Sequence, residues 1–273
     1  MTIKLVATDV DGTLLRSDGT ASDRTRTALR AANDAGLLVA FVSGRPPRWL
    51  DSLVDETGHV GMSVGANGAV LYDMATEQIV SSHLISSELI RELSDELRAE
   101  FPEVHFAIEF GRNFAAEPGY THDWDINPPL DRQGQPIPPP VVGPLAEISA
   151  TPAVKLLAKD AAADADQFLA AAVDLVGTRA TITHSSSFGL LEISAPGVTK
   201  ASGLAELAEQ RGIAPGEVLA VGDMPNDVPM LRWAGRSCAV ANAHPAARAA
   251  AQQVVVSNDE DAVAGLIEEL LTV

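Results

Sequence analysis

The chain has 273 residues, of which 46% are hydrophobic, which is enough for one large or two medium globular domains with packed cores. Its 19 Lys and Arg stand against 37 Asp and Glu, and the resulting formal charge of −18 argues against a nucleic-acid partner, since an acidic surface repels a phosphate backbone. The single cysteine, Cys238, excludes an internal disulfide, and the lack of a long apolar stretch or signal-like start predicts a cytoplasmic protein without membrane spans.

The first predicted element is a β-strand at residues 4–8, a short and mostly apolar run that leads into Asp9-Val10-Asp11-Gly12-Thr13. In an extended segment, residues two apart share a face, so the carboxylates of Asp9 and Asp11 are expected to point the same way. Two carboxylates that close are costly to ionise together unless a cation or a shared proton relieves them. The pair therefore suggests a divalent metal site.

Two other structures could explain an Asp-x-Asp-Gly sequence. A calcium-binding loop that began at Asp9 would need glycine at its sixth position and glutamate at its twelfth, but Leu14 and Thr20 stand there, so we set it aside. Asp11-Gly12 could also be a plain hairpin turn, and this segment alone leaves that alternative open.

The elements that follow continue an α/β pattern. Ser22 is the expected N-cap of a helix, and residues 37–42 are a continuous apolar run typical of a buried parallel strand. That strand leads into Ser43-Gly44-Arg45, so a second strand also ends in polar groups. Residues 62–72 carry Asn67-Gly68 between apolar residues, which predicts a hairpin, and Asn67 is either only a turn former or also a site residue.

Residues from about 84 to 190 follow a different pattern. The predicted elements are a helix at 89–101, strands at 104–109 and 154–158, a helix at 163–176 and a strand at 180–184. These are sufficient for a small α+β domain. Seven prolines between Pro128 and Pro144 cannot lie inside a helix or a central strand. They form either a proline-rich ligand for a signalling domain or, as we favour, a stiff loop in a substrate-facing region.

The first pattern resumes near residue 200. An amphipathic helix at 200–211 precedes an apolar strand at 218–221, which leads into Gly222-Asp223-Met224-Pro225-Asn226-Asp227. The remaining predicted elements are a short helix to 234, a strand at 237–240, a helix at 245–251, a strand at 254–256 and a helix at 259–271. This alternation predicts an α/β fold with a Rossmann-like, doubly wound parallel sheet as the core and an inserted α+β domain.

Three predicted strands carry polar groups at their carboxyl ends, namely Asp9 and Asp11, Ser43, and Asp223 and Asp227. Open α/β sheets bind ligands outside these ends, so the groups are expected to converge. With Lys200 they resemble, in order, the four motifs of the haloacid dehalogenase superfamily of phosphohydrolases, and the resemblance covers essentially the whole predicted core.

Further stretches are similar to the Cof-type branch of that superfamily: Gly-Ala-Asn-Gly-Ala around Asn67, the approach from Glu192 to Lys200, Asn-Ala after a late strand, and Ser-Asn-Asp-Glu-Asp near the end. Two positions depart from the usual pattern. Ala201 follows Lys200 where glycine is common, and Ala262 follows Asp261 where glycine is usual. Neither difference removes a catalytic group.

The resemblance implies a role for each motif residue. Asp9 would attack phosphorus and form an aspartyl phosphate, and Asp11 would protonate the leaving alcohol and then activate water. Mg2+ would be held by the carboxylates of Asp9 and Asp223 and the backbone carbonyl of Asp11, with Asp227 in or behind that shell. The phosphate oxygens would be held by Ser43, by N–H groups near Gly12 and Gly44, and by Lys200 and Asn226. Arg45, Asn67, Arg112, His122 and Trp124 are either further substrate contacts or ordinary surface and packing residues.

The spacing of the motifs predicts where the inserted domain lies. Only 29 positions separate Leu14 from Ser43, whereas 157 separate Ser43 from Lys200, so the insert falls between the second and third motifs. We expect a core at 1–83 and 191–273 and a cap domain at 84–190. The predicted function is hydrolysis of a small phosphorylated metabolite, such as a sugar phosphate or a phosphorylated cofactor. The alternatives are a phosphomutase or phosphotransferase, or a binding protein for such a metabolite without catalysis.

Overall fold

A computed structural model describes residues 2–120, 139–184 and 189–272 of the chain. The candidate contacts His122 and Trp124, and part of the proline-rich stretch, lie outside the described residues. Among the described residues, no helix combines the length and the apolar character needed to cross a bilayer.

The larger of two sheets has eight strands in the order β14-β13-β12-β1-β2-β3-β4-β5. Its strands are β1 (Leu5–Thr8), β2 (Leu38–Val42), β3 (Met62–Gly65), β4 (Val70–Asp73), β5 (Gln78–Ser82), β12 (Val218–Gly222), β13 (Arg236–Ala239) and β14 (Gln253–Val254). The strands from β14 to β3 are parallel, and β4 and β5 add an antiparallel edge. Strand β1 is central, and Leu5 lies opposite Val218 on one side and Leu38 on the other.

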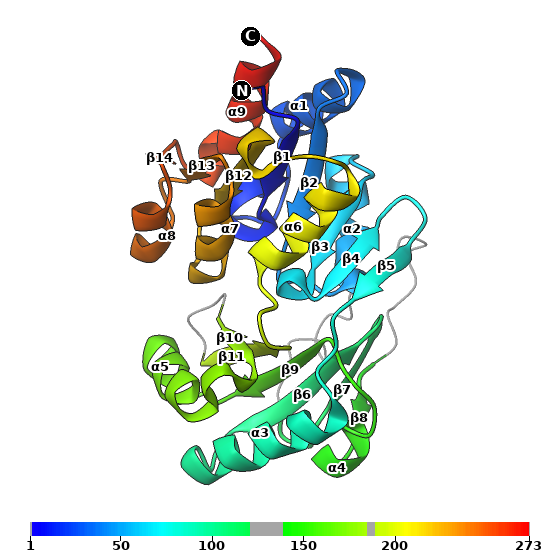
Figure 1. Cartoon of the computed structure of the whole chain (residues 1–273), viewed down its shortest axis with the longest axis vertical. Coiled ribbons are helices and arrows are strands. Elements are labelled where there is room, and N and C mark those ends of the chain that lie inside the picture. Colours follow the sequence, from blue (N-terminus) through cyan, green and yellow to red (C-terminus); the bar gives the residue numbers. More distant parts are fainter. Residues whose placement is uncertain (1, 121–138, 185–188, 273) are drawn as a thin grey trace.

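Helices cover both faces of this sheet (Figure 1). They are α1 (Asp23–Asp34), α2 (Pro47–Thr57), α6 (Lys200–Gln210), α7 (Val228–Trp233), α8 (Pro245–Ala250) and α9 (Ala262–Leu271). Helix α1 contacts α2 and α9, whereas α7 contacts α6 and α8, so the helices form two separate layers. The predicted α/β class with a doubly wound sheet is confirmed.

The second sheet has six strands in the order β10-β11-β9-β6-β7-β8. Its elements are α3 (Ser87–Glu100), β6 (His105–Phe110), β7 (Asn113–Ala116), β8 (Val141–Val142), α4 (Leu145–Ile148), β9 (Lys155–Lys159), α5 (Ala165–Val176), β10 (Thr181–Thr183) and β11 (Leu190–Ser194). Helices α3 and α5 contact each other, and α5 packs on β10 and β11. Strand β11 extends past residue 190, the position at which we placed the domain boundary. The domain limits stay a proposal.

Local sequence signals account for several of these elements. Ser22 caps α1, and its side chain accepts a hydrogen bond from the backbone N–H of Thr25. Residues Ala66–Gly68 join the antiparallel strands β3 and β4, as the Asn-Gly signal predicts. Cys238 is buried in β13, and burial raises the pKa of its thiol, which fits a core residue.

The sequence analysis did not anticipate α2, which begins immediately after the second motif. Pro46-Pro47 suggests a turn, but Pro47 occupies the first helical position, where a missing N–H costs nothing. Leu50, Leu53 and Val54 are buried at helical spacing, and Gly58, with a φ of 69°, ends the helix. The apolar spacing and the glycine were the signals that could have identified it.

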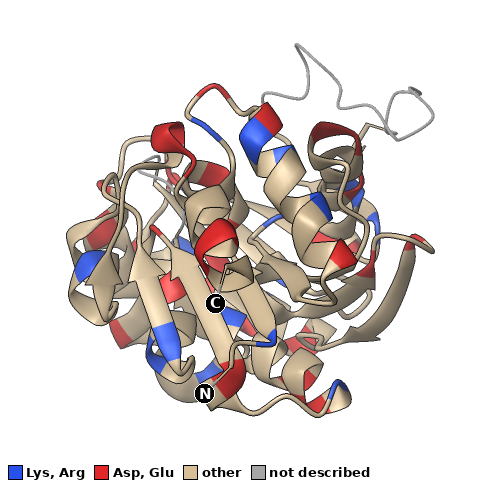
Figure 2. Ribbon diagram, turned by 90° about the horizontal axis from the view of Figure 1, so that it is seen from above, with Lys and Arg blue, Asp and Glu red and all other residues tan. Residues whose placement is uncertain are grey.

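Charged residues are spread over the whole molecule. Figure 2 shows Asp and Glu on helices and loops throughout the view, with Lys and Arg scattered among them. In this view the basic residues lie among acidic ones, in keeping with the net charge of −18.

Candidate active site

The loop after β1 delivers the first carboxylate into the interior. Asp9 is 5% exposed and directly follows the strand, and residues Val10–Leu14 then turn sharply. Gly12 allows this turn because its φ is 76°. An added Cβ at Gly12 would lie 2.7 Å from Oδ2 of Asp223, so the loop also needs a residue without a side chain there.

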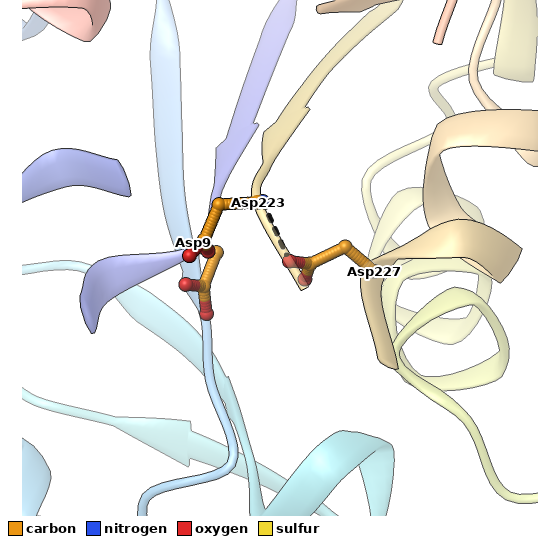
Figure 3. Close-up of side chains that lie close together, drawn as sticks. All are labelled: Asp9, Asp223 and Asp227. Atoms are coloured by element: carbon orange, nitrogen blue, oxygen red, sulfur yellow. Dashed lines mark hydrogen bonds between the residues drawn. The ribbon is translucent and has the colours of Figure 1, made fainter. Parts of the chain in front are cut away.

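Three buried carboxylates meet at the carboxyl ends of β1 and β12 (Figure 3). One oxygen from each of Asp9, Asp223 and Asp227 lies within 4.8 Å of the others. Oδ2 of Asp227 accepts hydrogen bonds of 2.9 Å from the backbone N–H groups of Asp223 and Met224. Oδ1 of Asp223 accepts one of 2.9 Å from the hydroxyl of Thr13. Of the groups expected to converge from the strand ends, Asp9, Asp223 and Asp227 form this cluster. Asp11 lies outside it, because residues Val10–Leu14 turn instead of continuing the extended strand that would place Asp9 and Asp11 on one face.

Lys200 supplies the positive charge of this cluster. It is the first residue of α6, and its Nζ donates 2.6 Å hydrogen bonds to Oδ1 of Asp9 and to Oδ1 of Asp227. Its side chain is only 2% exposed. The start of α6 is pressed against the β3–β4 turn, since an added Cβ at Gly68 would lie 1.9 Å from the carbonyl oxygen of Thr199.

The electrostatics of the cluster show an excess of buried negative charge. Burial raises the pKa of Asp9, and repulsion from Asp227 and Asp223 adds to this against the attraction of Lys200. Burial and Asp227 raise the pKa of Asp223 to about 6. Burial by itself would lower the pKa of Lys200, but the carboxylates of Asp227 and Asp9 raise it above its ordinary value.

This donor set fits a divalent metal ion. Three carboxylates face one ammonium group, and carboxylate oxygens are the ligands that hard divalent cations prefer. A bound cation would relieve the repulsion that raises the pKa values of Asp9 and Asp223. The buried cluster could therefore hold such an ion.

The second motif contacts Asp11. Arg45 donates from Nε to Oδ2 of Asp11 over 2.8 Å and from Nη2 to Oδ1 over 2.5 Å, a bidentate ion pair. The side chain of Asp11 is 58% exposed, and this carboxylate thus faces Arg45. Ser43 is buried, and its Oγ accepts a hydrogen bond of 3.1 Å from the backbone N–H of Arg45.

Two buried amides lie beside the cluster. Nδ2 of Asn226 donates a 3.1 Å hydrogen bond to Oδ1 of Asn67, a residue with a left-handed backbone. Among the described residues, Nδ2 of Asn67 and Oδ1 of Asn226 have no hydrogen-bond partner. Buried polar atoms without a partner are costly, so a bound ligand could satisfy them. This supports the assignment of both asparagines to the site.

Two positioning residues escaped the sequence analysis. Nδ2 of Asn242 donates to the carbonyl oxygen of Gly12 over 2.8 Å, and Nδ2 of Asn258 donates to that of Leu15 over 2.9 Å. Both therefore hold the loop that carries Asp11. They lie in the late Asn-Ala and Ser-Asn-Asp-Glu-Asp stretches that contribute to the family resemblance, which was the available signal.

The candidate contact Arg112 joins the two sheets. It lies between β6 and β7, and its guanidinium donates to the Asp51 carboxylate and to the Tyr72 hydroxyl. Asp51 belongs to α2 and Tyr72 to β4, so Arg112 docks the smaller sheet onto the larger one.

Comparison with known proteins identifies relatives over nearly the whole chain. The family model described as haloacid dehalogenase-like hydrolase matches residues 6–267. The "Putative phosphatase YxeH" of Bacillus subtilis (strain 168) is 30% identical, over 98% of each chain. The 5-amino-6-(5-phospho-D-ribitylamino)uracil phosphatase YcsE of the same organism is 27% identical, over 97% of this chain and 94% of its own. The crystal structure of SMU.1108c from Streptococcus mutans UA159 superposes with a TM-score of 0.86 at 24% identity, covering 100% of both chains.

Proposed function

This chain belongs to the haloacid dehalogenase-like hydrolases and is a phosphatase of phosphomonoesters, and on that premise we propose that it is a Mg2+-dependent enzyme that forms an aspartyl phosphate. The observation that carries this proposal is the convergence of Asp9, Asp223 and Asp227, with Nζ of Lys200 2.6 Å from two of them. The carboxylate that we propose as the nucleophile, its counter-charge and a donor set that could hold a metal ion thus lie at one edge of the sheet.

Asp9 is the proposed nucleophile. One of its oxygens attacks phosphorus, the bond between phosphorus and the ester oxygen breaks, and Asp11 gives its proton to the departing alkoxide. In the second half, Asp11 takes a proton from water as the water oxygen attacks phosphorus. This step breaks the acyl phosphate bond, releases inorganic phosphate, and restores the carboxylate of Asp9 and the protonated carboxyl group of Asp11.

Phosphoryl transfer also needs donors for the phosphate oxygens. Lys200 supplies a positive charge, and the unpartnered Nδ2 of Asn67 supplies a hydrogen-bond donor beside Asn226. The guanidinium of Arg45 contacts the Asp11 carboxylate, and its backbone N–H donates to the hydroxyl of Ser43. The guanidinium is therefore placed to exchange the Asp11 carboxylate for a phosphate oxygen of the substrate. We assign the hydroxyl of Ser43 and the N–H groups near Gly12 and Gly44 to the same phosphate.

Mg2+ would be held by the carboxylates of Asp9 and Asp223 and the backbone carbonyl of Asp11, with Asp227 in or behind that shell. When bound, it supplies positive charge that balances the phosphate oxygens and the three carboxylates. Asp227 already fixes the loop that carries Asp223 through two backbone hydrogen bonds. That loop is therefore held before any ion binds.

We propose a small phosphorylated metabolite of the cytoplasm as the substrate, either a sugar phosphate or a phosphorylated cofactor or its precursor. The name of YcsE supports this class, since it acts on a phosphorylated ribitylamino uracil. The acidic composition also supports a small ligand, because the net charge of −18 disfavours a nucleic acid.

The test is phosphate release from a panel of phosphomonoesters, with and without Mg2+, beside Asp9→Asn. The panel includes hexose phosphates and 5-amino-6-(5-phospho-D-ribitylamino)uracil. We expect metal-dependent release that the variant loses, with the free alcohol as the second product. A phosphorylated acceptor in place of free phosphate would indicate a phosphotransferase instead. No turnover by a folded protein that binds Mg2+ would refute the proposal.

A further inference from the structure

A buried lysine from the smaller sheet reaches the second motif of the larger one. Lys155 lies in β9 and is 1% exposed. Its Nζ donates to the carbonyl oxygen of Gly44 over 2.7 Å and to Oε1 of Glu192 over 2.6 Å. Gly44 stands between Ser43 and Arg45, and Glu192 lies in the neighbouring strand β11. The mechanism above makes no use of this ammonium group.

The surroundings of Lys155 indicate a specific position rather than an incidental contact. A buried ammonium group is costly unless it is paired and hydrogen-bonded, and here it has both kinds of partner. A second carboxylate is also near, since Oε2 of Glu109 lies 3.9 Å from Nζ of Lys155. An added Cβ at Gly44 would lie 3.3 Å from Oε1 of Glu192, so the second motif and the Lys155–Glu192 pair are in close packing.

The contact with Gly44 controls the orientation of one peptide group. The peptide between Gly44 and Arg45 is planar, so its C=O and N–H point in opposite directions. Lys155 holds the oxygen, and the N–H of Arg45 donates to Oγ of Ser43 over 3.1 Å. The carbonyl groups of Ser43 and Arg45 accept hydrogen bonds from the N–H groups of Asn67 and Ala66. The turn between β3 and β4 thus fixes both ends of this segment, and Lys155 holds its middle.

We propose that Lys155, held by Glu192, is a positioning residue that sets the Ser43 hydroxyl and Arg45 for phosphate binding through the Gly44–Arg45 peptide. The inference deepens the phosphatase proposal, on which it rests. Its consequence is that the phosphate site is fully formed only when the smaller sheet is docked. Lys155 then affects how the phosphate group is bound and not which leaving group the enzyme accepts.

Arg112 provides a matched control. It also joins the two sheets, but its partners are Asp51 in α2 and Tyr72 in β4, outside the segment from Ser43 to Arg45. Arg112→Met therefore weakens docking in general, whereas Lys155→Met also releases the carbonyl of Gly44. Lys155→Arg keeps the charge and tests for rescue. The double variant Lys155→Met/Glu192→Gln also removes the negative charge that the Lys155 ammonium balances, in case the single variant does not fold.

The experiment measures inorganic phosphate binding by calorimetry in Mg2+, and kcat and KM for one small and one large phosphomonoester. For Lys155→Met and the double variant we expect weaker phosphate binding and a lower kcat, each by about tenfold to a hundredfold, because small misplacements of binding groups are costly in catalysis. The loss in kcat should be equal for both esters, and Lys155→Arg should recover part of it. Arg112→Met should bind phosphate within about twofold of the unaltered protein, since it keeps the Gly44 contact.

Three results would overturn the inference. Unchanged phosphate binding in a folded Lys155→Met protein would show that the peptide needs no such support. A loss confined to the larger ester would make Lys155 a leaving-group contact, and an equal loss of phosphate binding in Arg112→Met would make it a general docking residue. Failure of the phosphatase proposal is distinguishable, because the unaltered protein would then release no phosphate from any ester whatever its phosphate affinity.

Discussion

Replacing Asp223 by asparagine should stabilise the metal-free protein at neutral pH. Burial and the neighbouring Asp227 raise the pKa of Asp223 to about 6, against an ordinary value of 3.8. The folded protein therefore binds more protons than the unfolded chain between these pH values, and its stability falls as the pH rises through them. A pKa difference of about two corresponds to roughly 3 kcal/mol, and this is the most by which ionised Asp223 lowers the free energy of unfolding.

Asparagine resembles the protonated acid and keeps an oxygen to accept the hydrogen bond from Thr13. The variant should thus unfold at a higher temperature than the unaltered protein at pH 7.5, by a few degrees, and show little difference near pH 4. The assay is thermal unfolding in EDTA across this pH range, with Asp95→Asn as a control, because Asp95 is exposed in the middle of α3. Added Mg2+ should stabilise the unaltered protein but not the Asp223→Asn variant.

A variant that is destabilised equally at both pH values would refute this reasoning, since it would show that ionised Asp223 costs the fold nothing. Retention of the Mg2+ effect would refute the second part, the assignment of Asp223 to the metal.

Three further predictions concern the same site. Lys200→Met should lower kcat/KM by about a hundredfold or more in steady-state assays. It should also lower the unfolding temperature, and by less at pH 5 than at pH 7.5, because the carboxylates that lose their ammonium partner can be protonated at the lower pH. Arg45→Ala should raise KM and lower kcat/KM by about tenfold to a hundredfold in steady-state assays, and an equal KM would contradict its assignment to the phosphate. Gly68→Ala should destabilise the protein by more than about 2 kcal/mol in denaturant titrations, since φ is 101° and the new Cβ would meet the carbonyl oxygen of Thr199, whereas Gly19→Ala, with open space around it, should cost less.

The sequence predicted the larger sheet well because its signals are local. The apolar runs that became β1, β2 and β12 are buried, apart from Leu38 at the start of β2, and each is followed by polar residues. Both the strand positions and the edge where the site lies therefore follow from the pattern. The convergence of Asp9 with Asp223 follows from the rule that parallel strands end at one edge.

Contacts between the two sheets could not be predicted in this way. Lys155 interrupts an apolar strand, which marks it as unusual, but nothing local identifies Gly44 as its partner 111 positions away. The docking of Arg112 on Asp51 likewise depends on how the sheets sit against each other. Side-chain pairing of this kind is set by tertiary packing, which periodicity does not encode.

The order in which the chain supplies its site residues affects its biosynthesis. Asp9 is made first, and Lys200, its partner in the cluster, follows 191 positions later, after the entire smaller sheet. At roughly 5–20 residues per second, the two are separated by about 10 to 40 seconds on the ribosome. The central strand β1 likewise cannot pair with β12, its neighbour on one side, until β12 has been synthesised. A product truncated within the smaller sheet would therefore carry Asp9 without Lys200 and Asp223, and the buried cluster can form only once both parts of the large sheet have been synthesised.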